Sequence, residues 1–265
     1  DNLKFDEEGI LEVKRKFFGT LYNTYSFYAL YANIDDFKYD KNAFPVCNRD
    51  KTDKWIISEM HSLIKDVEGY YEDYEPTKAS RAIQEFVINK LSNWYIRLNR
   101  RRFWKGEYNT DKKNAYSTLY ECLTNISLIS CPIAPFYMDR LYQDLNKKNS
   151  SIHLSGFPAF NEAYIDHSLE SQMQLAQNLS SSILSLRKKE KIRVRQPLQS
   201  ALVAPSSSFV KKGIVEAKQI ILSETNLKDL KIIDKDSEML SKTAKPNFKL
   251  LGPKYGSKIQ EISKA

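Results

Sequence analysis

Glycine and cysteine are scarce in this 265-residue sequence, which has 8 glycines and 3 cysteines. We find no glycine-rich loop that could cradle a phosphate and no nucleophile–base pair, so a complete small enzyme is not predicted. The cysteines are odd in number and widely spaced, which excludes a disulfide framework and a CxxC zinc site. The three histidines are isolated, and we therefore expect no metal site.

Long hydrophobic runs are also missing. No apolar stretch approaches the roughly 18 to 20 residues needed to span a bilayer. The N-terminus lacks the charged-then-apolar pattern of a signal peptide. We therefore expect no membrane partner and a reducing, cytoplasmic location. The sequence does not begin with Met, which fits a piece of a longer protein.

Charge is distributed unevenly along the chain. The formal net charge is +8, yet residues 1–75 contain 10 Lys/Arg against 16 Asp/Glu. The remaining residues contain 31 Lys/Arg against 17 Asp/Glu. A basic balance confined to one part of a chain indicates a polyanionic partner, although a Lys-rich solvated surface would give the same balance.

The first half of the chain shows the three- and four-residue apolar spacing of amphipathic helices. We predict antiparallel helices with short connections, which favours a helical bundle over residues 1–148. Thr52 or Asp53 is expected to cap the second helix, and Thr77 the third. Pro132 and Pro135 must break the fourth. The predicted helices span about 12–32, 55–70, 77–104, 112–131 and 138–145.

A polar stretch at 146–161 is interpreted as a domain boundary, and the sequence pattern changes after it. A helix over about 165–189 is expected to turn an apolar row inward. Its members are Leu169, Met173, Ala176, Leu179, Ile183 and Leu186. Strands at 198–204 and 226–234 flank a helix at 209–222. The fold class is therefore mainly α, with a small α/β unit within residues 149–265 that we expect to be truncated at its end.

The most informative segment covers residues 93–105, where five cations stand among large aromatic side chains. Arginine grips phosphates bidentately, and aromatic faces stack on unpaired bases. Trp94 continues the apolar row and is expected in the core, whereas Arg97 and Arg100 project away from it. Arg101 and Arg102 lie nearer the row, where the acidic segment Tyr70–Glu75 could hold them instead. The candidate RNA-binding residues here are Arg97, Arg100, Arg101, Arg102, Trp104 and Lys105.

A second basic segment runs from Arg187 to Arg195 and carries six cations against Glu190 alone. Cations at a helix end also offset the helix dipole, so a solvated helix terminus is the alternative interpretation. The pattern of strands and helix that follows supports a second interpretation equally well, in which this segment forms the edge of a groove that faces RNA. The candidates in this segment are Lys188, Lys189, Arg193 and Arg195.

Several motifs, in the family's order, together resemble the C-terminal anticodon-binding region of the isoleucyl-tRNA synthetases, a class I aminoacyl-tRNA synthetase family. They are Asn93-Trp94-Tyr95 with Arg102, the Pro132-x-x-Pro135-Phe136 break, Glu12–Thr24, Arg187–Lys189 with Val194–Leu198, and Lys245–Phe248 with Leu251–Gly256. The valyl and leucyl enzymes share the bundle. The last two motif pairs favour isoleucine.

This resemblance implies a binding module that docks the anticodon stem-loop of isoleucine tRNA. The parent enzyme would join isoleucine to tRNA with ATP and Mg²⁺, and its catalytic domain would pack on the N-terminal side. The family's His-x-Gly-His and Lys-Met-Ser-Lys-Ser motifs and its editing domain do not appear, so we predict a non-catalytic region without a cofactor of its own. We also expect a monomer. The alternatives are a helical protein-interaction scaffold and the same region of a valyl or leucyl enzyme.

Overall fold

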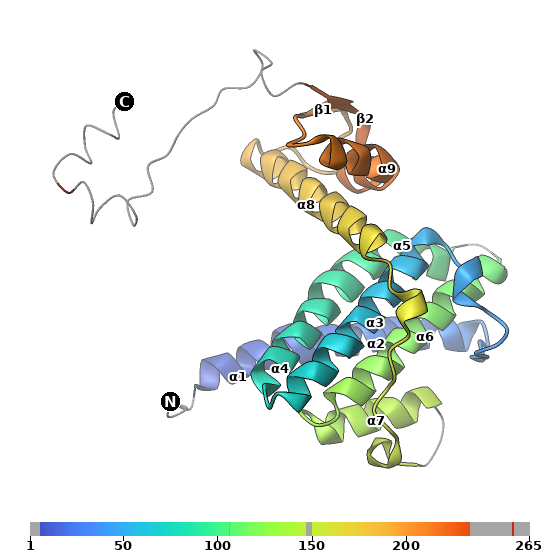
Figure 1. The fold of residues 1–265 in the computed structure, drawn as a ribbon. Helices are drawn as coiled ribbons and strands as arrows, with labels where there is room; N and C mark the ends of the chain where they lie inside the picture. The colour runs from blue at the N-terminus through green and yellow to red at the C-terminus, as the bar shows by residue number, and fades with distance from the viewer. Residues whose placement is uncertain (1–5, 106, 147–149, 234–255, 257–265) are drawn as a thin grey trace.

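The computed structural model describes residues 6–105, 107–146, 150–233 and 256. It confirms the predicted fold class, a mainly helical protein with a small α/β unit (Figure 1). Residues 6–146 form the bundle, whose helices are α1 (Glu7–Val13), α2 (Gly19–Ile34), α3 (Lys51–Glu72), α4 (Pro76–Glu85), α5 (Arg97–Trp104), α6 (Thr110–Ser130) and α7 (Pro135–Asn146). The Lys245–Phe248 motif and residues 251–255 of the motif that follows it lie outside the described residues.

The chain stays helical across two π-helical segments, η1 (Lys14–Phe18) and η3 (Phe86–Ile96). The first joins α1 to α2, so the N-terminal helix begins at Glu7, earlier than predicted. The second joins α4 to α5 and places Trp94 and Tyr95 in the core, at 3% and 0% exposure. The single long helix expected over 77–104 is therefore confirmed in extent, but its middle is π-helical.

Two of the predicted helix caps are wrong. Asp50, and neither Thr52 nor Asp53, caps α3, because its carboxylate accepts the backbone N–H of Thr52 at 2.8 Å. Helix α4 begins with Pro76 at its first turn, where the missing N–H costs nothing, and Thr77 does not cap it. The break after α6 is confirmed, since α7 starts at Pro135.

The bundle core is rich in aromatic side chains. Trp55, Tyr95, Phe103 and Tyr116 are all at most 1% exposed. Phe103 packs edge-to-face on Tyr116, with ring centroids 5.5 Å apart. Each such burial contributes roughly 1.5 to 3 kcal/mol. This core fixes the helix that carries the arginine-rich segment.

Helix α8 (His167–Lys189) extends from the bundle and leads into the α/β unit (Figure 1). Its buried row is Met173, Ala176, Ser180, Ile183 and Arg187. Leu186, which the apolar pattern turned inward, is 62% exposed. The next buried residue after Ile183 is four positions further on, so the charged Arg187 is the buried residue at the end of the helix.

The α/β unit is a strand–helix–strand motif. Strands β1 (Leu198–Val203) and β2 (Leu227–Ile232) pair in parallel, with Leu198 opposite Leu227. Helix α9 (Ser208–Thr225) makes the crossover and packs on α8. The Ser207 hydroxyl caps α9 by accepting the Val210 N–H. Asn226 ends the helix with φ 51°, the left-handed conformation that Asn and Gly favour there.

Helix α8 is fixed to the bundle by a polar cluster on α3. The Ser58 hydroxyl donates to the Glu170 carboxylate at 2.6 Å and accepts the Asp166 N–H at 2.8 Å. Ser62 donates to the same carboxylate at 2.7 Å. Burial alone would raise the pKa of Glu170, but these hydroxyls and His167 outweigh it and leave the pKa below its ordinary value.

Membrane spans and metal clusters are both absent from the described part of the chain. No helix there is long and apolar enough to cross a membrane. Within the same residues, no group of His, Cys, Asp and Glu side chains is placed to hold a metal ion.

Candidate nucleic-acid interface

The predicted basic segment forms α5, at the end of the bundle where α6 begins. Trp94 is buried, as predicted. The five cations do not share one environment, because the helix turns some toward the core and others to solvent. Each cation therefore has its own set of contacts.

Arg102 lies in a partly buried network of carboxylates, and its side chain is only 16% exposed. Its Nη2 atom donates to Asp53 at 2.8 Å and to Asp111 at 2.7 Å, and Nη1 donates to Asp53 and to the Asn99 amide oxygen. Asp53 is fully buried and also accepts the Tyr95 hydroxyl at 2.6 Å. Burial would lower the pKa of Arg102, but the Asp53 carboxylate outweighs it and raises the pKa further.

The partners of Arg102 correct the sequence-based expectation. Arg102 was a candidate RNA contact, with the acidic segment Tyr70–Glu75 as an alternative partner, whereas Asp53 and Asp111 hold it. Its Nε atom also donates to Asp111, so all three guanidinium nitrogens already have carboxylate acceptors. Arg102 is thus engaged in holding α3, α5 and α6 together.

Arg97 connects the bundle to the α/β unit. Its Nε atom donates to the Glu224 carboxylate on α9 at 2.6 Å, and its Nη2 atom donates to the same oxygen. The guanidinium also lies 5.9 Å from the Trp94 ring centroid. The Arg97 side chain is 48% exposed, so it borders the surface with its charge already paired.

The remaining candidates on α5 face solvent. Arg100 and Arg101 are exposed, and neither has a carboxylate partner in the described part of the chain. Trp104 is 48% exposed, and the Lys105 ammonium lies 5.4 Å from its ring centroid. An exposed indole beside cations offers a stacking surface next to phosphate-binding groups.

The second basic segment ends α8 and continues into the loop before β1. Lys188, Lys189, Arg193 and Arg195 are all exposed. None of them is ion-paired within residues 6–233 as far as these are described. Arg187 differs, being 3% exposed and directed at backbone carbonyls. Sequence reasoning missed its inward position because a charged side chain at a helix end is usually solvated.

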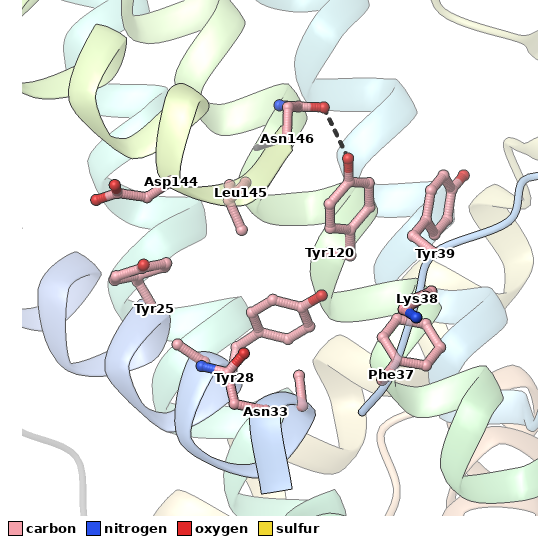
Figure 2. Close-up of a pocket in the computed structure, with 12 residues that line it drawn as sticks. Tyr25, Tyr28, Asn33, Phe37, Lys38, Tyr39, Tyr120, Asp144, Leu145 and Asn146 are labelled. Atoms are coloured by element: carbon pink, nitrogen blue, oxygen red, sulfur yellow. Dashed lines mark hydrogen bonds between the residues drawn. The ribbon is translucent and has the colours of Figure 1, made fainter. Parts of the chain in front are cut away.

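A tyrosine-lined hollow between α2, α6 and α7 was not predicted (Figure 2). It encloses about 300 Å³ and is lined by Tyr25, Tyr28, Tyr39 and Tyr120 among others. The last two rings stack at 4.2 Å, and Tyr120 donates to the Asn146 side chain. Burial raises the pKa of Tyr28 and Tyr39, so their phenols stay neutral. The only sequence signal was the count of 16 tyrosines, which are scattered along the chain.

Fold and surface together define a helical bundle with an appended α/β unit and exposed cations on the bundle and after α8. Residues 53–202 match the family model described as the anticodon-binding domain of tRNA ligase. The chain belongs to this family.

Curated relatives match over the whole chain. It is 53% identical to the isoleucine–tRNA ligase of Cytophaga hutchinsonii over 100% of this chain, and 50% identical to that of Bacteroides thetaiotaomicron over 100%. The isoleucine–tRNA ligase of Thermus thermophilus is 35% identical over 99% of the chain. The chain spans about a quarter of the length of these relatives, 24%, 23% and 26% respectively.

Proposed function

We propose that this chain is the tRNA-recognition part of an isoleucine–tRNA ligase and docks the anticodon stem-loop of isoleucine tRNA. The observation that carries the proposal is the match of the entire chain to isoleucine–tRNA ligases, together with its family membership. Exposed cations on α5 and after α8 supply phosphate contacts that position the RNA, and Trp104 supplies a stacking surface for an unpaired base.

The chemistry of the proposed parent enzyme lies outside this chain. We propose that the parent uses ATP and Mg²⁺, acts in the cytoplasm as a monomer and places its catalytic domain against the N-terminal side. Ile10, Leu11 and Val13 on α1 support that placement, because all three are at least 45% exposed. The isolated chain should show no isoleucine-dependent ATP–pyrophosphate exchange. Exchange above background from the pure chain would contradict this assignment.

Binding to several tRNA species tests the function itself. A titration of the full-length protein should show tighter binding of isoleucine tRNA than of other tRNAs, with affinity falling steeply as salt rises. A helical scaffold that binds proteins would show neither discrimination among tRNAs nor salt-dependent RNA affinity. That result would favour the alternative.

A further inference from the structure

The loop between α8 and β1 has an unusual backbone. Residues Lys191–Gln196, here called the α8–β1 loop, begin with a left-handed residue, Lys191, with φ 57°. Arg193, Val194, Arg195 and Gln196 are all exposed. The Gln196 N–H donates to the Arg193 carbonyl at 3.0 Å, which closes a turn around Val194 and Arg195.

Two side chains hold the carbonyls of this loop. Arg187 Nη1 donates to the carbonyls of Arg193 at 3.2 Å and Gln196 at 3.0 Å. Asn226 Nδ2 donates to the carbonyls of Val194 at 2.9 Å and Arg195 at 3.2 Å. Four consecutive carbonyl oxygens, which would repel an anion, are thus occupied by donors of the protein itself.

Unlike these carbonyls, several backbone N–H groups of the same loop have no protein partner in the described part of the chain. Those of Arg193, Val194 and Arg195 have no hydrogen-bond partner among the described residues. These residues are exposed, so water is the acceptor that a phosphate oxygen would replace. Successive free N–H groups beside arginine side chains are the donor set that a phosphate oxygen accepts from.

Arg187 adds a buried charge beneath the loop. It is 3% exposed, its Nε atom is buried without a partner, and no carboxylate pairs with it in the part of the chain that the structure describes. Its Nη2 atom donates to the Asn226 carbonyl at 3.1 Å. Helices α8 and α9 both end here, and Arg187 offsets the partial negative charge of their C-termini. A buried cation without a counter-ion leaves the loop ready for an anion.

We propose that the α8–β1 loop is a pre-organised binding site for a phosphodiester of the tRNA backbone, with Arg193 and Arg195 as contacts. Arg187 and Asn226 are positioning residues that hold the loop from behind. This inference rests on the proposed function, because it names where the RNA backbone is gripped. It predicts a contact that fixes the position of the tRNA and carries no sequence preference of its own.

The first test removes the contacts in the full-length protein. Arg193→Ala and Arg195→Ala should each weaken binding of all tRNAs about equally. Each should flatten the slope of log affinity against log salt by up to about 0.7 to 0.9. Lys211→Ala is the matched control, because Lys211 is an exposed cation near the opposite end of α9. If Arg195→Ala and Arg193→Ala both behave like the control, the loop is not the contact.

The second test removes the positioning and leaves every cation in place. Asn226→Gly keeps the left-handed backbone at φ 51° but deletes the donors to Val194 and Arg195. We expect affinity for tRNA to fall about tenfold, the change that corresponds to one lost charged-group contact. The salt slope should flatten by up to about 0.7 to 0.9, as expected when a phosphate contact is lost although both arginines remain. The melting temperature should fall little, because Gly is favoured at this left-handed position. Unchanged affinity in Asn226→Gly would overturn the positioning role of Asn226.

Two controls distinguish a phosphodiester contact from a free-phosphate site and from a general failure of RNA binding. At matched ionic strength, inorganic phosphate should displace tRNA no better than chloride does. Displacement that is specific to phosphate would show a site for free phosphate and contradict the phosphodiester proposal. If the unaltered protein binds no tRNA, the proposed function fails. If it binds tRNA and the loop variants match it, only the loop inference fails.

Discussion

The bundle core and the end of α8 hold their cations in opposite ways. In the bundle core, four buried or half-buried cations are paired with carboxylates. The pairs are Arg49–Glu121, Lys90–Glu59, Arg102–Asp53 and Lys112–Asp35. At the end of α8, the buried Arg187 binds carbonyls, and the cations around it stay exposed. The ion pairs of the bundle core neutralise positive charge within the protein, whereas the exposed cations at the end of α8 remain available to a partner.

This difference explains the uneven charge of the sequence. Asp35, Asp53 and Glu59 belong to the acidic first 75 residues, and their partners lie between residues 90 and 112. Part of the acidic excess therefore neutralises cations of the later helices within the fold. The unpaired basic excess is therefore smaller than the sequence total, and the cations that we propose as RNA contacts lie on α5, at its end and after α8.

The largest expected effect is the loss of the cation that pairs with a buried carboxylate. Arg102→Ala leaves the fully buried Asp53 with the Tyr95 hydroxyl but no cation and should lower the free energy of unfolding by about 3 to 5 kcal/mol. Arg101→Ala, one residue away and exposed, should change it by less than about 0.5 kcal/mol. Urea unfolding of both variants measures this. Equal stability of the two would contradict the contrast between buried and exposed arginines.

These contacts show where sequence reasoning succeeds and where it stops. Helix extents and the strand–helix–strand order were predictable, because apolar spacing and proline breaks are local signals. The partners of Arg102 were not, because Asp53 lies 49 residues away and no local pattern links them. The π-helical segment η3 was not predictable from the sequence either, because the spacing of apolar residues does not distinguish a π-helix from an α-helix. The burial of Arg187 was not predicted, because its charge suggested a solvent-exposed side chain although its position continues the buried row of α8.

The next largest effect concerns Trp104. Its indole is 48% exposed, so Trp104→Ala should leave thermal stability nearly unchanged. If it stacks on an unpaired base, the variant should lose roughly 1 to 3 kcal/mol of binding to isoleucine tRNA. Binding measured alongside a melting curve separates a stacking role from packing over the bundle end. A strong loss of stability with unchanged discrimination between anticodons would make Trp104 structural.

A smaller effect is expected in acid at the junction of the two regions. The folded pKa of Glu170 lies below its ordinary value of 4.5, so its contribution to stability is present above that pH. The contribution is lost as pH falls through the lowered folded pKa. Glu170→Gln should reduce stability near neutral pH by about 1 kcal/mol and weaken its dependence on acid. If the free energy of unfolding of the variant depends on acid as that of the unaltered protein does, Glu170 does not stabilise the junction between α3 and α8.

The smallest effect compares two arginines on α5. Arg100→Ala should weaken binding to all tRNAs and flatten the salt slope by up to about 0.7 to 0.9. Arg97→Ala should flatten it less, because Glu224 already neutralises Arg97. Glu224→Gln should release Arg97 and steepen the slope. A Glu224→Gln slope equal to that of the unaltered protein would mean that Arg97 does not reach the RNA.

One measurement tests the central proposal most directly. The full-length protein is titrated with isoleucine tRNA and with the same tRNA carrying an exchanged anticodon, at several salt concentrations. We predict that the exchange weakens binding about tenfold or more, by analogy with base readout worth about 1 to 3 kcal/mol. Both tRNAs should lose affinity with similar salt slopes, because they share the backbone contacts. Equal affinity for the two tRNAs would contradict the proposal that this chain recognises the anticodon.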